Sequence, residues 1–289
     1  MNRLTHFSFH SALCRLGLHR IVLSALMTMC QSLAAESVQW QGSFQQGGLV
    51  LGKLPPAYSV IYKGEKLKIS PQGYFLLGFN RDAPKTVKVT VLDERANQSQ
   101  EILTISKRVY NTQRIEGVPQ QTVTPSETDL KRIRNDSRMV GQARSQVTDD
   151  VDFLDGFILP LEGIVTGVYG SQRFYNGVPK RPHYGIDYAA PTGTPVAAPA
   201  SGIVVFAHSD LFYSGGTMIV DHGHGLSSTF LHLSEILVEQ GQRVERGEFI
   251  AKVGASGRAT GPHLDWRMNW RYERIDPELV LKTLPATKQ

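Results

Sequence analysis

The stretch Arg181-Pro-His-Tyr-Gly-Ile-Asp-Tyr-Ala-Ala-Pro-Thr-Gly-Thr-Pro-Val-Ala-Ala-Pro199 carries the most informative pattern in the chain. It places His183 four residues before Asp187, and turn residues then lead into an apolar run. The residues between the two are poor helix formers, so an extended conformation is favoured. In a strand, side chains four residues apart point to the same face, so the imidazole and the carboxylate should share one. These groups are two of the three protein ligands that a zinc site needs.

Residues 1–34 have the pattern of a secretory signal peptide. Three arginines and no acid accompany the apolar run Ile21–Met29, and Ser32-Leu33-Ala34 is a small-x-small cleavage site. The apolar run is too short to span a bilayer, so cleavage is favoured over a transmembrane anchor. We therefore expect an exported protein, periplasmic or associated with the cell envelope, with no stable membrane span after the segment is removed.

The two cysteines of the chain, Cys14 and Cys30, both lie in this segment. The mature chain would form no disulfide, and its core must be stable without one. Loss of the three arginines lowers the formal net charge from +5 to +2. This small charge gives no reason to expect a nucleic-acid partner, although weak attraction to an anionic cell-wall polymer remains open. The remaining residues suffice for two modest domains joined by a linker.

Residues 36–110 alternate short apolar runs with turn residues, which is typical of a small antiparallel β-sandwich. The predicted strands are Leu49–Leu51, Ser59–Tyr62, Leu67–Ile69, Tyr74–Phe79, Thr86–Val91 and Glu101–Ile105. No catalytic cluster occurs among these residues. We therefore interpret this domain as a spacer or a binding module.

Residues 111–150 are polar and predict a linker with a short helix. Ser126 is a suitable N-cap, and Ile133, Met139 and Val140 form only a thin apolar stripe. Five basic residues are mixed with acids and have no aromatic residues between them. A solvated linker is therefore favoured over a nucleic-acid patch.

Residues 151–289 return to short strands divided by glycines, which predicts a compact β-rich domain. The expected strands are Ile164–Val168, Gly202–Ala207, Thr217–Asp221, Ser228–Leu233 and Phe249–Val253. Two further histidines stand out here. His232 alternates with apolar neighbours, and His263 shares a strand face with Asp265. A single histidine on a strand is more often a surface or core residue than a ligand, so the residues alone leave both roles open.

Residues 156–270 resemble the catalytic domain of the lysostaphin-type (LytM-like) zinc metallopeptidases, which cut peptide cross-bridges in bacterial cell walls. The resemblance implies a mainly β chain with a domain of the duplicated-hybrid-motif type, and it does not include the N-terminal domain. The matching pieces are Gly167-Val-Tyr-Gly170 with Arg173, His183-Tyr-Gly-Ile-Asp187, Ala190-Pro-Thr-Gly-Thr-Pro195, Gly202-Ile-Val204, Val220-Asp-His-Gly-His-Gly225, Leu231-His-Leu-Ser234, Gly241-Gln-Arg-Val244, Gly247 and Thr260-Gly-Pro-His-Leu264.

The resemblance also implies residue roles. It makes His183 and Asp187 ligands of a zinc ion that activates water, and it makes His232 and His263 the groups that move protons and stabilise the developing oxyanion. The implied function is a hydrolase, a zinc-dependent endopeptidase that cleaves peptide bonds in peptidoglycan cross-links. His222 and His224 lie in a turn that has no metal role in the family, so we interpret them as structural.

The chain departs from the family at the third ligand. The family usually has His-x-His in the last motif, whereas this chain has His263-Leu264-Asp265. A carboxylate can bind zinc, so Asp265 remains the expected third ligand. Two carboxylates should neutralise the metal charge and make its water less acidic, which predicts a weaker enzyme or a different preferred metal.

This departure keeps an alternative open. Some members of the family have lost their metal and bind and activate another cell-wall hydrolase. Those members usually lose several site residues, whereas here one position differs, so an active enzyme is favoured over a silent regulator. The expected partners are peptidoglycan peptides and, in the alternative, that second hydrolase.

Four residues are predicted to form the walls of a groove for an extended peptide: Tyr169, Arg173, Tyr175 and Tyr213. The length of the linker also suggests that it folds back over this groove as a latch.

Overall fold

The computed structural model describes residues 37–286; the predicted signal peptide and both cysteines lie outside this range. The described part is mainly β, as predicted, with strands throughout and few helices. None of its helices has the length and apolar character needed to cross a bilayer.

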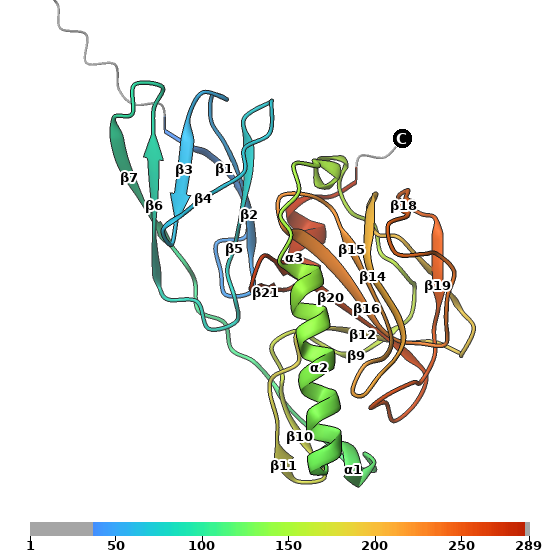
Figure 1. The fold of residues 1–289 in the computed structure, drawn as a ribbon. Coiled ribbons are helices and arrows are strands. Elements are labelled where there is room, and N and C mark those ends of the chain that lie inside the picture. Colours follow the sequence, from blue (N-terminus) through green and yellow to red (C-terminus); the bar gives the residue numbers. More distant parts are fainter. Residues whose placement is uncertain (1–36, 287–289) are drawn as a thin grey trace, which may run out of the picture. The chain divides into compact units, whose positions relative to one another are not determined.

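Two antiparallel sheets form the N-terminal part (Figure 1). One has the order β1-β2-β5 and the other β4-β3-β6-β7. The prediction of a strand at Leu67–Ile69 is wrong: the short partner of β3 is β4, and the chain leaves the sheet at Leu67, whose side chain is buried in the core. The bounds are β1 (Gln39–Gly42), β2 (Leu49–Lys53), β3 (Ser59–Tyr62), β4 (Glu65–Lys66), β5 (Tyr74–Gly78), β6 (Thr86–Leu92) and β7 (Gln98–Thr104).

The segment after these sheets is more ordered than a solvated linker. It forms β8 (Thr112–Ile115), α1 (Gln120–Val123) and α2 (Glu127–Arg144), so the predicted short helix has 18 residues. Ser126 caps α2 as predicted, in a capping box with Asp129. The thin apolar stripe is sufficient because Met139, Val140 and Ala143 pack against Phe206, Leu211 and Ile219.

The C-terminal part is built on an eight-stranded sheet with the order β18-β14-β15-β16-β20-β12-β9, in which β21 also pairs with β20. A short 3-10 helix, Asp152–Asp155, precedes this sheet in the chain. The bounds are β9 (Ile164–Gly167), β12 (Gly185–Ala189), β14 (Gly202–Leu211), β15 (Gly215–Asp221), β16 (Leu226–Leu233), β18 (Arg243–Val244), β20 (His263–Trp270) and β21 (Glu273–Ile275).

Two small sheets and a helix complete the fold. The sheet β13-β19-β17 consists of β13 (Pro195–Ala197), β19 (Phe249–Lys252) and β17 (Glu235–Ile236). The other joins β11 (Val178–Pro179) and β10 (Gln172–Tyr175) to β8, which pairs with β10 in parallel. The helix α3 (Pro277–Thr283) begins at the N-cap Asp276.

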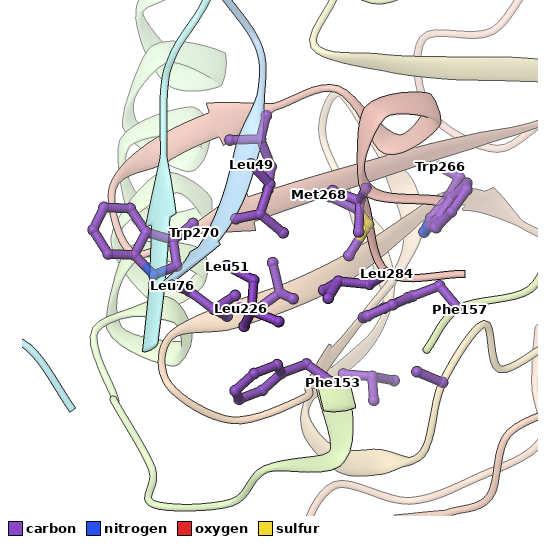
Figure 2. Close-up of a cluster of buried hydrophobic side chains, with 14 of the residues drawn as sticks. Leu49, Leu51, Leu76, Phe153, Phe157, Leu226, Trp266, Met268, Trp270 and Leu284 are labelled. Atoms are coloured by element: carbon purple, nitrogen blue, oxygen red, sulfur yellow. The ribbon is translucent and has the colours of Figure 1, made fainter. Parts of the chain in front are cut away.

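A single hydrophobic cluster connects the N-terminal sheets with the eight-stranded sheet (Figure 2). Trp266 and Met268, fully buried on β20, lie near Phe157 in this cluster. At the end of β20, the Trp270 ring lies 6.0 Å from that of Tyr62. A Cβ added at Gly78 would lie only 2.8 Å from the Cβ of Trp270, so a glycine is needed for this close approach.

His222 is a structural residue of this core, and its environment predicts a pH-dependent stability. Its Nδ1 lies 2.8 Å from the Ser201 carbonyl and its Nε2 lies 2.9 Å from the Ser228 hydroxyl. Burial lowers its pKa to about 4, against the opposing effect of the Ser201 hydrogen bond. The unfolded ring takes up a proton near pH 6.5. The contribution of His222 to the free energy of unfolding should therefore be complete above that pH and fall by about 3 kcal/mol as the pH drops to about 4.

This expectation is tested by urea unfolding of the wild type and of His222→Gln between about pH 7 and about pH 4. The variant should be less stable at neutral pH but should lose less stability on acidification, because glutamine does not titrate. Equal pH slopes for the two proteins would contradict the assignment.

Candidate metal centre and cleft

His183, Asp187 and Asp265 come together at one end of β12. Each offers a ligand atom within 4.8 Å of those of the other two, and all three side chains are buried. Asp187 on β12 and Asp265 on β20 are cross-strand partners, so their side chains leave the sheet on the same face. His183 lies in the loop before β12, where its backbone N–H donates to the Ser171 carbonyl at 2.8 Å.

The unpaired polar atoms of this cluster fit a metal ion. Both ring nitrogens of His183 and Oδ1 of Asp187 are buried without a hydrogen-bond partner. His183 Nε2 lies 3.1 Å from Asp187 Oδ1, but the two groups are not aligned for a hydrogen bond. Each such atom costs about 1–3 kcal/mol when left unsatisfied. A cation between the imidazole and the carboxylates would satisfy one ring nitrogen of His183 and Oδ1 of Asp187, and these are ligand atoms that zinc accepts.

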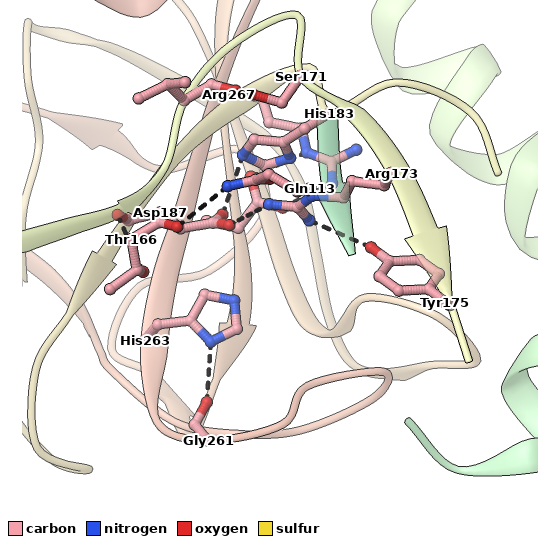
Figure 3. A network of polar contacts seen from close by, with 12 residues as sticks. Gln113, Thr166, Ser171, Arg173, Tyr175, His183, Asp187, Gly261, His263 and Arg267 are labelled. Carbon is pink, nitrogen blue, oxygen red and sulfur yellow. Dashed lines mark hydrogen bonds and ion pairs between the residues drawn. The ribbon is translucent and has the colours of Figure 1, made fainter. Parts of the chain in front are cut away.

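Each carboxylate of the cluster also binds an arginine, and Figure 3 shows the pair of Arg173 with Asp187. Arg173 donates to Oδ2 of Asp187. Arg267 holds Asp265 with two hydrogen bonds, Nε to Oδ1 at 2.9 Å and Nη2 to Oδ2 at 2.6 Å. The two guanidinium groups balance the two carboxylates. The two carboxylates and the two arginines together carry no net charge. The expectation of a less acidic metal-bound water stays a prediction.

The two carboxyl groups stay ionised in this arrangement. Burial opposes ionisation of Asp265, but Arg267 and His183 outweigh it and hold the pKa below its usual range. Burial and the charge of Asp265 act in the same way on Asp187, and the balance with His183 and Arg173 again leaves the pKa lowered. Both groups are therefore available as anionic ligands at neutral pH.

The absence of a side chain at Gly185 and Gly167 leaves room for the two carboxylates. A Cβ at Gly185 would lie 2.5 Å from Asp265 Oδ1 and 2.6 Å from the Cγ of Arg267, and a Cβ at Gly167 would overlap Asp187 Oδ2. Both glycines were part of the matched sequence motifs. Their structural reason is the close approach of the neighbouring strands to the candidate ligands.

His232 and His263 lie together beside the cluster, with ring centroids 4.7 Å apart. Nδ1 of His232 lies 2.7 Å from the Ser256 carbonyl, and Nδ1 of His263 lies 2.8 Å from the Gly261 carbonyl. A carbonyl oxygen only accepts hydrogen bonds, so each Nδ1 carries a proton. Burial lowers the pKa of His232 to about 4, although Asp265 opposes the shift. This ring is therefore neutral at physiological pH and can accept a hydrogen bond or a proton.

A bulge in β16 directs His232 to the site. The register of β15 and β16 shifts between Gly216 and Met218, and His232 takes a positive φ of 63°. Both Leu231 and His232 consequently line the cleft, which simple alternation does not predict. A non-glycine residue in this backbone region is uncommon and is often found at functional sites.

These groups open into a cleft of about 950 Å³. Arg173, Tyr175 and Tyr213 line it as predicted. Tyr169 does not line it: the residue is buried, donates its hydroxyl to the Arg274 carbonyl at 2.7 Å and packs edge-on against Tyr184. The prediction for Tyr169 is therefore wrong.

The linker forms part of the cleft wall. Gln113 accepts a hydrogen bond from Nε of Arg173 at 3.2 Å and donates one to the Thr166 carbonyl at 3.3 Å. The linker residues in the wall are Gln113, Arg114, Ile115, Val118, Ile133 and Ser137. The segment lies against the groove, where the latch hypothesis needs it, and movement of the latch stays a prediction.

Sequence reasoning missed several residues of the site. Arg267 follows Asp265 by two positions, so strand alternation could have placed it on the same face. Gln113 reaches the site through the parallel pairing of β8 with β10, for which a four-residue segment with three polar residues gives no signal. His222 and His224 do not line the cleft, as expected of structural residues.

Comparison with known proteins gives a consistent result. Residues 181–277 match the model of peptidase family M23. The peptidoglycan DD-endopeptidase ShyA of Vibrio cholerae is 44% identical over 87 residues, which are 30% of this chain and 20% of that protein. The DD-carboxypeptidase/endopeptidase Mpg of Neisseria meningitidis is 39% identical over 109 residues, 38% of this chain and 25% of that protein. The chain thus spans about a fifth to a quarter of the length of these relatives.

A solved structure extends the likeness beyond the site. A protein of Pseudomonas aeruginosa described as a peptidase M23 aligns with a TM-score of 0.67 and 28% sequence identity, over 84% of this chain and 97% of that one. The similarity therefore includes most of the N-terminal sheets as well as the cleft.

Proposed function

We propose that the protein is a metal-dependent endopeptidase that hydrolyses peptide bonds in peptidoglycan cross-links, because residues 181–277 match the model of peptidase family M23. The observation that carries the proposal is the cluster of His183, Asp187 and Asp265, which presents unsatisfied buried ligand atoms beside His232 and His263. The named activities of the relatives support the substrate class. The predicted signal peptide supports an exported, periplasmic or envelope-associated protein.

The residues have distinct parts in this proposal. His183, Asp187 and Asp265 would hold a zinc ion, which supplies a Lewis acid that activates water and polarises a peptide carbonyl. His232 is neutral and carries its proton on Nδ1, so its Nε2 can take a proton from the nucleophile and return it to the leaving amine, with His263 beside it in the cleft. Tyr175 and Tyr213 line the space in which an extended peptide would lie.

The test is release of soluble peptides from purified peptidoglycan by the zinc-supplemented protein, analysed by mass spectrometry. Release should stop on chelation and return with zinc. His232→Gln should keep the metal content of the wild type but lose hydrolysis by about 10²–10⁴-fold, as expected for a general acid–base group. No release by the zinc-loaded wild type would contradict the proposal.

The arginines favour a second candidate function, a metal-free regulator of another cell-wall hydrolase. Arg173 and Arg267 occupy oxygens of both candidate carboxylate ligands, and they balance the charge that a metal ion would otherwise balance. In this case the chelated protein should stimulate a wall amidase and should bind zinc no better than His183→Ala does. Absence of both stimulation and binding to the amidase would exclude this candidate.

A further inference from the structure

The cleft has an excess of positive charge that the candidate metal centre does not use. Seven basic residues line it, and its two acidic residues, Asp187 and Asp265, are already paired with arginines. Among residues 37–286, the remaining five have no carboxylate within salt-bridge distance. These five are Arg114, Lys180, Arg181, Arg258 and Arg274.

Arg258 is the one of these five groups that packs against two aromatic rings. Its guanidinium lies 4.4 Å from the ring centroid of Tyr213 and 4.6 Å from that of Tyr175, so two aromatic rings hold it. Its backbone N–H donates to the Tyr213 carbonyl at 2.8 Å. Gly257, at a φ of 71°, permits this contact, because a Cβ there would lie 2.6 Å from the same carbonyl. The side chain is thus fixed before any ligand binds.

The hydrogen bonds of Arg258 do not explain why a cation is placed there. Its guanidinium makes one long hydrogen bond, from Nη1 to the Thr122 carbonyl at 3.4 Å. Burial lowers its pKa, and the nearby tyrosines oppose this effect only in part. Partial burial of a cation without an anionic partner is unfavourable, and an anionic ligand would offset that cost.

We propose that Arg258 is the receptor for a free carboxylate of the peptide that occupies the cleft, an assignment that rests on the proposed peptidoglycan-peptide function. A planar guanidinium matches a carboxylate with two parallel hydrogen bonds, and stacking on aromatic rings leaves its donor edge free. An uncharged or amidated peptide offers no such partner. The protein therefore distinguishes peptides by their ionised carboxyl groups.

The position of Arg258 couples this receptor to the candidate metal centre. The Tyr175 ring stacks on Arg258, and its hydroxyl accepts a hydrogen bond from Nη1 of Arg173 at 3.2 Å. Arg173 in turn binds Asp187 (Figure 3). A carboxylate held at Arg258 thus fixes the peptide near the candidate metal centre, because Tyr175 contacts both Arg258 and Arg173, and Arg173 binds Asp187.

The experiment measures binding of an uncross-linked muropeptide, which has no cross-link to hydrolyse, to the full-length protein in zinc-containing buffer by calorimetry. The second ligand is the same muropeptide with its carboxyl groups amidated. For the wild type, the free carboxylate form should bind about ten- to a hundredfold more tightly, as expected for a charge-assisted pair. Arg258→Gln should bring the affinity for that form down to that for the amidated ligand.

Two variants serve as controls. Arg258→Lys keeps the charge but loses the planar fork, so it should retain only part of the preference. Arg114→Gln removes an exposed cation from the same cleft, where it stacks on Phe174, and should change the preference by less than about threefold.

The outcomes separate this inference from the proposed function. A purely structural role of Arg258, which holds α1 through Thr122, predicts equal losses for both ligands and would overturn the inference. Equal wild-type affinity for the two ligands would overturn it as well. A preference that depends on Arg258 would support it even if peptidoglycan hydrolysis failed, whereas hydrolysis by Arg258→Gln with an unchanged preference would overturn the inference alone.

Discussion

Replacing His183 by alanine is expected to abolish metal binding and, with it, hydrolysis of peptidoglycan. His183 supplies the nitrogen ligand of the cluster, and neither of its ring nitrogens has another partner among the described residues. Zinc affinity should fall by at least about a hundredfold, because the loss of a residue that only supports a ligand already costs 10–100-fold. Peptide release should fall below about a thousandth of the wild-type rate.

The measurements are metal content after dialysis and the increase in melting temperature on addition of zinc, which reports binding to the folded state independently of activity. The control is His208→Ala, since His208 stacks on Phe206 outside the cleft. Zinc should stabilise this control as it stabilises the wild type. A zinc-dependent increase in the melting temperature of His183→Ala equal to that of the wild type would show that the metal binds elsewhere.

Replacing Arg267 by glutamine is expected to strengthen zinc binding about ten- to a hundredfold. Arg267 occupies both oxygens of Asp265 with charge-assisted hydrogen bonds, each worth about 1.5–3 kcal/mol, and its positive charge repels a divalent cation beside it. Removal of the guanidinium frees Asp265 as a ligand. Titration with zinc against a competing chelator measures the change directly.

A matched surface arginine provides the control for this experiment. Arg243 also forms two hydrogen bonds with a carboxylate, that of Asp152, but lies outside the cleft, so Arg243→Gln should leave zinc affinity unchanged. Weaker zinc binding by Arg267→Gln would mean that Arg267 orients Asp265 for the metal and does not compete with it. Tighter binding together with faster hydrolysis would identify Arg267 as the residue that limits the wild-type enzyme.

The sequence predicted the parts of the site that depend on local spacing. His183 with Asp187, and His263 with Asp265, have fixed positions along an extended chain, and the matched motifs connected the two pairs. The environment of Asp265 depends instead on the register of β12 and β20, which places Gly185 opposite Arg267. Registers between distant strands leave little trace in a single sequence, so the charge balance of the cluster became visible only in the structure.

The same reason explains the errors in the cleft. Tyr169 has the residue type of a groove wall, but its hydroxyl finds a partner in the Arg274 carbonyl on a strand more than a hundred residues away, and the ring turns into the core. The linker was expected to be solvated because its apolar stripe is thin. That stripe is sufficient to hold the helix in place because Phe206 on β14 and Ile219 on β15 pack against it. Such a contact between distant segments cannot be predicted from local composition.

The close contact of Gly78 with Trp270 has a consequence for how the protein responds to damage. Trp270 ends the strand that carries Asp265, and Arg108 forms a 2.7 Å ion pair with Asp276, the N-cap of the last helix. The N-terminal sheets thus pack against β20, the strand that carries Asp265. Partial unfolding of these sheets would therefore destabilise that strand too. Unfolding of the N-terminal sheets and loss of the candidate metal centre should therefore be one event, so that no fragment with the centre alone intact persists.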